Sequence, residues 1–396
     1  MSPECSEMEI VGNWRKFLAN YRSVKPNFVQ KASVLENKHY GDEINLEEFP
    51  IPMWHPDDGG RYIGTGCIVV TKDPDTDWVN CGAYRMMLQD KDKANLFIVK
   101  GKHGSIIRDK YWKQGKPLPV AVSLGHDPIY FLIGGMEIPY GESEYDFIGA
   151  IRNNPVDLIN TPLYNIPVPA ESEIVIEGEV WPDDTLPEGP FGEWTGYYAG
   201  GRREAPVMRV KGIYHRNSPI LLGAIPSIPP SDINYYRSPL RAAAVWDQLE
   251  KAGVPGVKSV WAHEVGGARM LLIVAIEQLY PGHSRQVGLI ASQCHAAAYA
   301  NKAVIVVDSD IDVTSLNQVV WAVLTRTNPS EDIDILRKCW TSKVDPTSYP
   351  PGKNHYNDRV VIDACRAWDL KDDFPKVITI APDTLKKIKT KWPELF

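Results

Sequence analysis

Two glutamates, Glu188 and Glu193, lie five residues apart in the segment EGPFGEWTGYY at 188–198. On a helix this spacing turns the second carboxylate roughly 140° from the first, and on a strand it puts the two on opposite faces. A turn around Pro190 and Gly192 can instead bring the chain back beside itself and pair the two acids. Paired carboxylates can divide acid and base work, one ionised and the other protonated. An isolated pair is more often a solvated loop, so the rest of the sequence decides.

Three further stretches contain polar residues that a plain strand or loop does not need. Asn80 and Arg85 lie in WVNCGAYRMM, His103 lies in KGKHGSIIRDKYW, and Glu144 lies in the carboxylate-rich GGMEIPYGESEYDFIGAIR. Asn80 and Arg85 would point to opposite faces of a regular strand, unless Gly82 marks a bulge. Taken singly, the first stretch indicates an edge strand and the other two indicate surface loops. Hard divalent ions favour oxygen donors with some imidazole, so Asn80, His103 and Glu144 would suit one if the fold gathers them.

The composition is that of a globular protein without a nucleic-acid or membrane partner. The 396 residues are 43% hydrophobic, which is enough for two or three domains with cores. The net charge of −7 does not favour binding to nucleic acid or anionic membranes. The six cysteines form no C-x-x-C pair, which argues against disulfides or structural zinc. With no signal peptide and no long apolar run, we expect a cytoplasmic location.

The elements that must position these residues fall into two patterns. Residues 1–50 are polar and weakly patterned, and we interpret them as an N-terminal arm. From 51 to 225 the chain shows short β-rich runs between turns, which is typical of a barrel or sandwich. Those runs are CIVVT, WVNCGAY, NLFIV, PVAVSL, SEIVIEGEV and PVMRVKGIYH.

Strands and helices alternate from 226 to 380, which predicts an α/β domain with a parallel sheet. Ser238 and Pro239 are expected to start the first helix of this domain, and Gly253 to end it. A basic helix at 381–396 has an apolar stripe that must dock on its own body or on another subunit.

Taken together, these stretches resemble the UbiD family of decarboxylases, which use prenylated flavin mononucleotide. The resemblance runs from about residue 46 to 363 and depends on NCGAYR, KHG, GGMEIP, SEYDFIGA, EGPFGEWTGYY and NDRVVIDA, in family order. It implies a central split β-barrel, similar to flavin reductases, with a C-terminal α/β domain and a terminal helix. The overall class is therefore a mixture of α+β and α/β. The arm at 1–50 would be the remnant of a larger N-terminal domain.

The resemblance also implies roles for particular residues. Asn80, His103 and Glu144 match the family's ligands for Mn²⁺ or another divalent ion, which is held against the cofactor phosphate. Arg85, Glu188 and Glu193 match its catalytic arginine and acids. The cofactor would contact a wider set: Ala83, Tyr84, Arg85, Lys102, His103 and Met136. Met136 and its backbone also match a stretch that lines a monovalent cation site, for which K⁺ is expected.

The implied reaction is reversible, non-oxidative decarboxylation of an aromatic or α,β-unsaturated acid. Removal of CO₂ from an sp² carbon needs an electron sink that no side chain provides, so a cofactor must supply it. Glu193 would then donate the proton, Glu188 would supply a second negative charge, and Arg85 would keep that acid ionised. A flavin prenyltransferase would supply the cofactor, and the chain would form a homo-oligomer, a dimer or a hexamer.

The substrate residues and two other functions stay open at this point. His263, in SVWAHEVGGARM, could meet a phenol hydroxyl or a ring heteroatom, or could simply close a strand. Lys343, like Lys102, is a basic candidate for binding the substrate carboxylate. The short N-terminus would also fit a non-catalytic or partner-dependent subunit of a larger carboxylase. A hydrolase could use the glutamate pair, but Arg85 and the metal set would then have no purpose.

Overall fold

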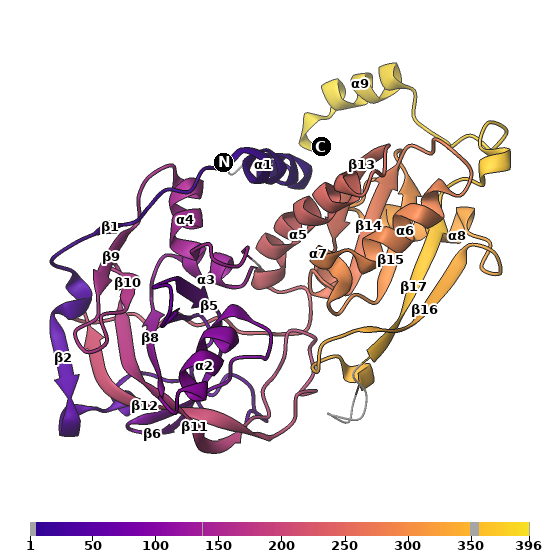
Figure 1. The fold of residues 1–396 in the computed structure, drawn as a ribbon. Helices are drawn as coiled ribbons and strands as arrows, with labels where there is room; N and C mark the ends of the chain where they lie inside the picture. Colours follow the sequence, from indigo (N-terminus) through magenta and orange to yellow (C-terminus); the bar gives the residue numbers. More distant parts are fainter. Residues whose placement is uncertain (1–4, 137, 349–355, 396) are drawn as a thin grey trace.

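The computed structural model describes residues 5–136, 138–348 and 356–395. It contains two large sheets, one in each half of the chain (Figure 1). A third, three-stranded sheet joins β1 (Asn27–Phe28), β9 (Asp157–Asn160) and β10 (Pro167–Pro169). The chain is therefore a mixed α/β protein with several sheets.

The first large sheet is antiparallel and positions most of the predicted site residues. Its order is β3-β6-β7-β12-β11-β8-β4-β5, with β2 added beside β12. The strands are β2 (Asn37–Tyr40), β3 (Tyr62–Gly64), β4 (Ile68–Lys72), β5 (Val79–Gly82), β6 (Met86–Asp90), β7 (Lys93–Leu96), β8 (Leu118–Leu124), β11 (Ile174–Glu188) and β12 (Arg203–His215). Within the described part of the chain no pairing joins β3 to β5, so no closed barrel is found. The split-barrel description stays a prediction.

Two helices in this half, α2 (His103–Lys113) and α4 (Glu144–Arg152), correct the expectation of loops, and a third helix, α3 (Pro128–Gly134), lies between them in the chain. Most of KGKHGSIIRDKYW belongs to α2. Ser143 caps α4, because its Oγ accepts a hydrogen bond from the Tyr145 N–H at 3.4 Å. Glu144 is thereby fixed as the first helical residue, and its side chain is buried.

The second large sheet has the order β13-β14-β15-β17-β16. Its strands are β13 (Val257–Ala262), β14 (Leu271–Ile276), β15 (Ala303–Asp308), β16 (Ile333–Trp340) and β17 (Tyr356–Ala364). The pairs β14–β15 and β15–β17 are parallel, as predicted, whereas both edge strands are antiparallel. The sheet is therefore mixed. The boundaries predicted between the domains are not tested by this arrangement and stay predictions.

The first helix of this half begins earlier than predicted. α5 runs from Asp232 to Lys251 and encloses Pro239, because Ser231 and Asn234 form a capping box before it. The following helical stretch is broken at Cys294 into α6 (His283–Gln293) and α7 (His295–Ala298). α8 (Leu316–Arg326) begins directly after Ser315, whose side chain accepts a hydrogen bond from the Gln318 N–H.

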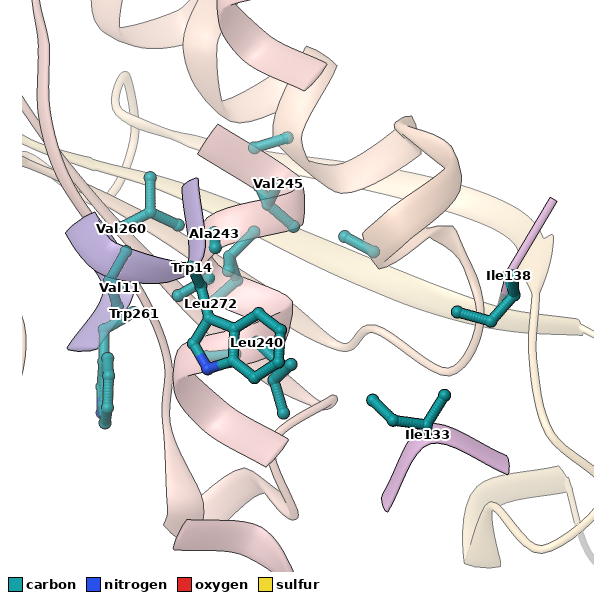
Figure 2. Packing of buried hydrophobic residues seen from close by; sticks show 14 of the residues in the cluster. Val11, Trp14, Ile133, Ile138, Leu240, Ala243, Val245, Val260, Trp261 and Leu272 are labelled. Carbon is teal, nitrogen blue, oxygen red and sulfur yellow. The ribbon is translucent and has the colours of Figure 1, made fainter. Parts of the chain in front are cut away.

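The arm at the N-terminus forms α1 (Glu7–Asn20), which packs on α5 across the two halves (Figure 1). Figure 2 shows Val11 and Trp14 of α1 among side chains that include Leu240 and Ala243 of α5. Burial of such side chains stabilises each by roughly 1.5–3 kcal/mol relative to leaving it exposed. The arm is therefore part of the main hydrophobic core.

The remaining sequence predictions concern thiols, membrane spans and the last helix. All six cysteines are free, as predicted. Within the described residues, no helix has the length and apolar character needed to cross a membrane. The last helix, α9 (Pro382–Lys391), has no buried residue and lies apart from the second sheet (Figure 1).

Candidate active site

An arginine joins the two glutamates whose spacing raised the question of pairing. Glu188 is the last residue of β11, and Arg85 lies in the connection between β5 and β6. Arg85 Nε is 2.7 Å from Glu188 Oε1, and its Nη2 is 3.1 Å from Oε2, so the pair is bidentate. Arg85 Nη1 also donates to Glu193 Oε1. Both acids are thus brought to one guanidinium.

Burial and charge act on Glu188 in opposite directions. Burial by itself would raise the pKa of Glu188, but Arg85 and Arg203 outweigh burial and hold that pKa below its usual value. Burial likewise would lower the pKa of Arg85, but the charges of Glu193 and Glu188 outweigh it, so that pKa is raised. Glu188 is therefore an ionised carboxylate and Arg85 a cation.

The network is more enclosed at Glu188 than at Glu193. The Glu188 side chain is 1% exposed, whereas those of Glu193 and Arg85 are 11% and 16% exposed. A molecule approaching the network therefore reaches Glu193 and Arg85 before Glu188.

Neighbouring loops hold the turn between the two acids. The Gly59 N–H donates to Pro190 O at 2.7 Å, and the Gly192 N–H donates to Asp58 Oδ1 at 2.9 Å. A Cβ at Gly192 would lie 2.4 Å from the ring of His55, so the chain can approach this closely only with glycine. The predicted need for glycine in this turn is explained by a contact with a distant loop.

Three residues of the network were not predicted from the sequence. Tyr62 donates its hydroxyl to Glu188 Oε1 at 3.2 Å, and the Phe191 ring centroid is 4.8 Å from Arg85 Cζ. Arg203 lies 3.3 Å from Glu188 Oε2 through its Nε. Phe191 lies between the two acids in the sequence, whereas only the fold brings Tyr62 and Arg203 to them.

Two of the three predicted metal ligands are in direct contact. Asn80 of β5 donates from Nδ2 to Glu144 Oε1 at 2.7 Å, and the Cys81 N–H donates to Glu144 Oε2 at 2.8 Å. Burial raises the pKa of Glu144 to about 7. Asn80 Oδ1 is buried and has no hydrogen-bond partner within the described residues. A buried, unpartnered amide oxygen beside a carboxylate fits a hard divalent cation.

His103, the third predicted ligand, lies in the same region among aromatic side chains. Its ring centroid is 5.2 Å from that of Trp78 and 5.6 Å from that of Tyr140. Trp78 Nε1 also donates to Glu142 O at 2.8 Å, which ties the start of β5 to the loop before α4. These contacts place His103 beside the two segments that carry Asn80 and Glu144.

The residues predicted to contact the cofactor lie on and around the connection between β5 and β6. The Ala83 N–H donates to Gly134 O at 3.0 Å, and the Tyr84 ring packs on Gly104, where a Cβ would lie 3.2 Å from its hydroxyl. Met136 is half-buried against the core, and Lys102 is exposed directly before α2. The set therefore lies on the β5–β6 connection, the start of α2 and the segment after α3.

The two predicted substrate segments contact residues directly after Glu193. A Cβ at Gly267, in the turn that begins at His263, would lie 2.6 Å from the Trp194 ring. Thr195 donates its hydroxyl to Val344 O at 3.0 Å, next to Lys343. His263 accepts the Val265 N–H at Nδ1, and its buried Nε2 has no partner among the described residues.

Comparison with known families identifies the chain. The UbiD model for the 3-octaprenyl-4-hydroxybenzoate carboxy-lyase Rift-related domain matches residues 27–229, and the model for the C-terminal domain matches residues 234–364. The chain belongs to the UbiD family of carboxy-lyases. Phenolic acid decarboxylase of Escherichia coli O157:H7 is 34% identical over 385 residues, covering 95% of this UbiD chain and 78% of that protein. Pyrrole-2-carboxylic acid decarboxylase of Pseudomonas aeruginosa is 33% identical over 316 residues, 78% of this chain and 63% of that protein.

Solved UbiD structures share the fold. HmfF from Pelotomaculum thermopropionicum, in complex with FMN, has a TM-score of 0.85 at 27% identity, covering 96% of this chain and 82% of that chain. The closed form of vanillic acid decarboxylase from Sedimentibacter hydroxybenzoicus has a TM-score of 0.83 at 29% identity, covering 99% of this chain and 82% of that chain. The family predicted from the sequence motifs is therefore confirmed.

Proposed function

We propose that this UbiD protein decarboxylates an aromatic carboxylic acid, reversibly and without net oxidation, with prenylated FMN bound. The observation that carries the proposal is the bridge from Arg85 to both Glu188 and Glu193. Relatives named for phenolic and pyrrole-2-carboxylic acids support an aromatic substrate.

The proposed cofactor is supported by structures of HmfF with FMN and, in an evolved dimeric form, with prFMN. Ala83, Tyr84, Arg85, Lys102, His103 and Met136 would hold it. When bound, the modified flavin supplies the electron sink that side chains lack. An Mn²⁺ or similar ion would lie at Asn80, His103 and Glu144, and K⁺ would lie near Met136. The unpartnered Asn80 Oδ1 is the feature that supports the divalent site.

Glu188 and Glu193 have different proposed roles because their side chains differ in exposure. Glu188 is enclosed and held ionised, so it anchors Arg85 and does not meet the substrate. Glu193 has the more accessible carboxylate of the pair, so it takes up a proton from solvent and delivers it to the substrate carbon that has lost CO₂. In the carboxylation direction the same carboxylate removes that proton.

Substrate recognition is proposed for the two segments next to Glu193. His263 would meet a ring hydroxyl or heteroatom through its unpartnered Nε2, and Lys343 would attract the substrate carboxylate. We also propose a homo-oligomer. Its support is the apolar stripe predicted for the terminal helix, in which Trp392, directly after α9, remains 40% exposed.

The proposal is tested with protein co-produced with a flavin prenyltransferase. We expect a visible flavin absorbance and CO₂ release from some member of a panel of hydroxybenzoic, vanillic and pyrrole-2-carboxylic acids. Protein produced without the prenyltransferase is the control and should be inactive. Colourless protein that is inert to the whole panel would contradict the proposal and favour a partner-dependent subunit.

A further inference from the structure

A second group of metal-ligating side chains lies outside the proposed active site. His39 in β2, His215 at the end of β12 and Glu48 at the end of the short 3₁₀ helix Leu46–Glu48 each offer one ligand atom, and these atoms lie within 4.8 Å of one another. The two Nε2 atoms are 3.0 Å apart. Among the described strands β2 pairs with β12 alone and lies off the main strand path, so this group links the N-terminal arm to the central sheet.

The tautomer of His215 is set by its other ring nitrogen. Nδ1 lies 2.8 Å from Arg216 O, and because a carbonyl only accepts, Nδ1 must donate. The Nε2 atom therefore carries a lone pair directed at His39. Metal-binding histidines commonly donate their second nitrogen to a backbone carbonyl in this way. The edge contact of Phe49 with the ring, at 5.6 Å, further fixes its orientation.

A hydrogen bond between the two histidines alone would leave the third member of the cluster, the Glu48 carboxylate, without a role. Without an ion, His39 Nε2–H must donate to His215 Nε2, and that single bond satisfies both nitrogens. Within the described chain the Glu48 carboxylate makes no hydrogen bond or ion pair, although one of its oxygens belongs to the cluster. A cation would use all three side chains together.

We propose that His39, Glu48 and His215 bind one divalent transition-metal ion, with Zn²⁺ the best match. Two imidazoles and a carboxylate suit Zn²⁺ better than Mg²⁺ or Ca²⁺, which prefer oxygen. Zn–N bonds of about 2.0–2.1 Å in a tetrahedral site put two ligating nitrogens about 3.3 Å apart. The observed 3.0 Å requires a shift of only a few tenths of an ångström. The open fourth position would take water, because the site is at the surface.

The ion would fasten the arm to β12 and have no part in decarboxylation. Binding to the folded chain alone stabilises that chain by mass action, so the melting temperature would rise with zinc concentration. This proposal is independent of the divalent site at Asn80 and Glu144. A difference between variants is needed, because Zn²⁺ could also enter that oxygen-rich site.

The test uses untagged, full-length protein stripped by a chelator and titrated with Zn²⁺ alone. Wild type should bind one Zn²⁺ more than His39→Gln, and Glu48→Gln should bind the same ion roughly tenfold more weakly. Glu43→Gln, on an exposed neighbouring residue, and His295→Gln, on an exposed histidine elsewhere, are the matched controls and should behave as wild type.

Electron paramagnetic resonance with Cu²⁺ as the probe provides a second readout that does not need a histidine variant to fold. Wild type should show coupling to two imidazole nitrogens, and Glu48→Gln should retain it. Equal zinc stoichiometry and affinity in wild type and His39→Gln would overturn the proposal. If His39→Gln does not fold, a copper spectrum of wild type without two-nitrogen coupling would overturn it instead.

Discussion

Arg203 lies directly opposite Glu188 in the β11–β12 ladder, and its Nε is 3.3 Å from Glu188 Oε2. The anchoring acid is therefore held between two guanidiniums, with Arg85 on its other side. Burial and the nearby charge of Arg85 lower the pKa of Arg203 below its usual value, and the charges of Glu188 and Glu193, which raise it, compensate only in part. We propose that Arg203 acts on the reaction through Glu188, as a positioning residue.

Replacement of Arg203 should alter the pH profile as well as the rate. In Arg203→Gln one of the charges that lower the pKa of Glu188 is lost, so that pKa should rise and the acidic limb of kcat should move to higher pH. We expect kcat to fall about tenfold, a loss of roughly 1.4 kcal/mol. Arg203→Lys should recover part of the shift, and Arg202→Gln, at the exposed neighbour, should leave the profile unchanged. A lower rate with an unmoved profile would contradict the positioning role.

Glu188 should also make stability depend on pH. Because its pKa is lowered in the folded state, its ion pairs stabilise the fold above the unfolded pKa of about 4.3, and this contribution is lost as the pH falls through the folded pKa. Glu188→Gln should cost about 3 kcal/mol at pH 7. The deficit should shrink at pH 3.5, as measured by urea unfolding. Glu204→Gln, at an exposed site, is the control, and a deficit that is equal at both pH values would disprove the linkage.

Asn80 should be required for divalent ion binding. Asn80→Ala removes the unpartnered buried oxygen, so purified protein reconstituted with Mn²⁺ should lose the ion by elemental analysis. Asn80→Asp retains an oxygen donor and should keep most of it. Asn20→Ala, at an exposed position of α1, is the matched control. Full Mn²⁺ content in Asn80→Ala would rule out Asn80 as a ligand.

Gly192→Ala should displace the turn that holds Glu193. The added Cβ would lie 2.4 Å from the His55 ring, which is itself held by Pro226 O at 2.7 Å. We expect a loss of about 1–3 kcal/mol of stability and a drop in kcat of about 100-fold, since the acid moves. Gly12→Ala, where no atom lies within 4 Å, should instead stabilise α1 slightly. Unchanged kcat in Gly192→Ala would show that the turn tolerates displacement.

The sequence predicted those elements whose pattern is local. The alternating runs became the strands of the first sheet, and the alternation of strands and helices predicted after residue 226 is observed in the second half. Most of the loop predicted at 100–112 is instead α2, because the contacts that hold this polar segment come from other parts of the chain. The start of α5 was predicted too late because proline is a strong signal for the first turn of a helix. The capping box at Ser231 instead starts the helix earlier, with Pro239 inside it.

Only the site residues that lie within the family motifs were predicted from the sequence. The motifs indicated Arg85, Glu188 and Glu193, and the structure joins them through ion pairs. Spacing alone could not find Arg203, since it meets Glu188 through the register of two long strands. Tyr62 likewise contacts Glu188, although the two residues are 126 positions apart in the sequence.

The central claim is that Glu193 transfers the proton, and the most direct test is turnover by Glu193→Gln. The variant is made with the flavin prenyltransferase and compared with wild type for flavin content and for CO₂ release from the best substrate of the panel. We predict normal flavin binding with CO₂ release reduced at least about 1,000-fold, in line with loss of a general acid. Near-normal turnover by flavin-loaded Glu193→Gln would contradict the account.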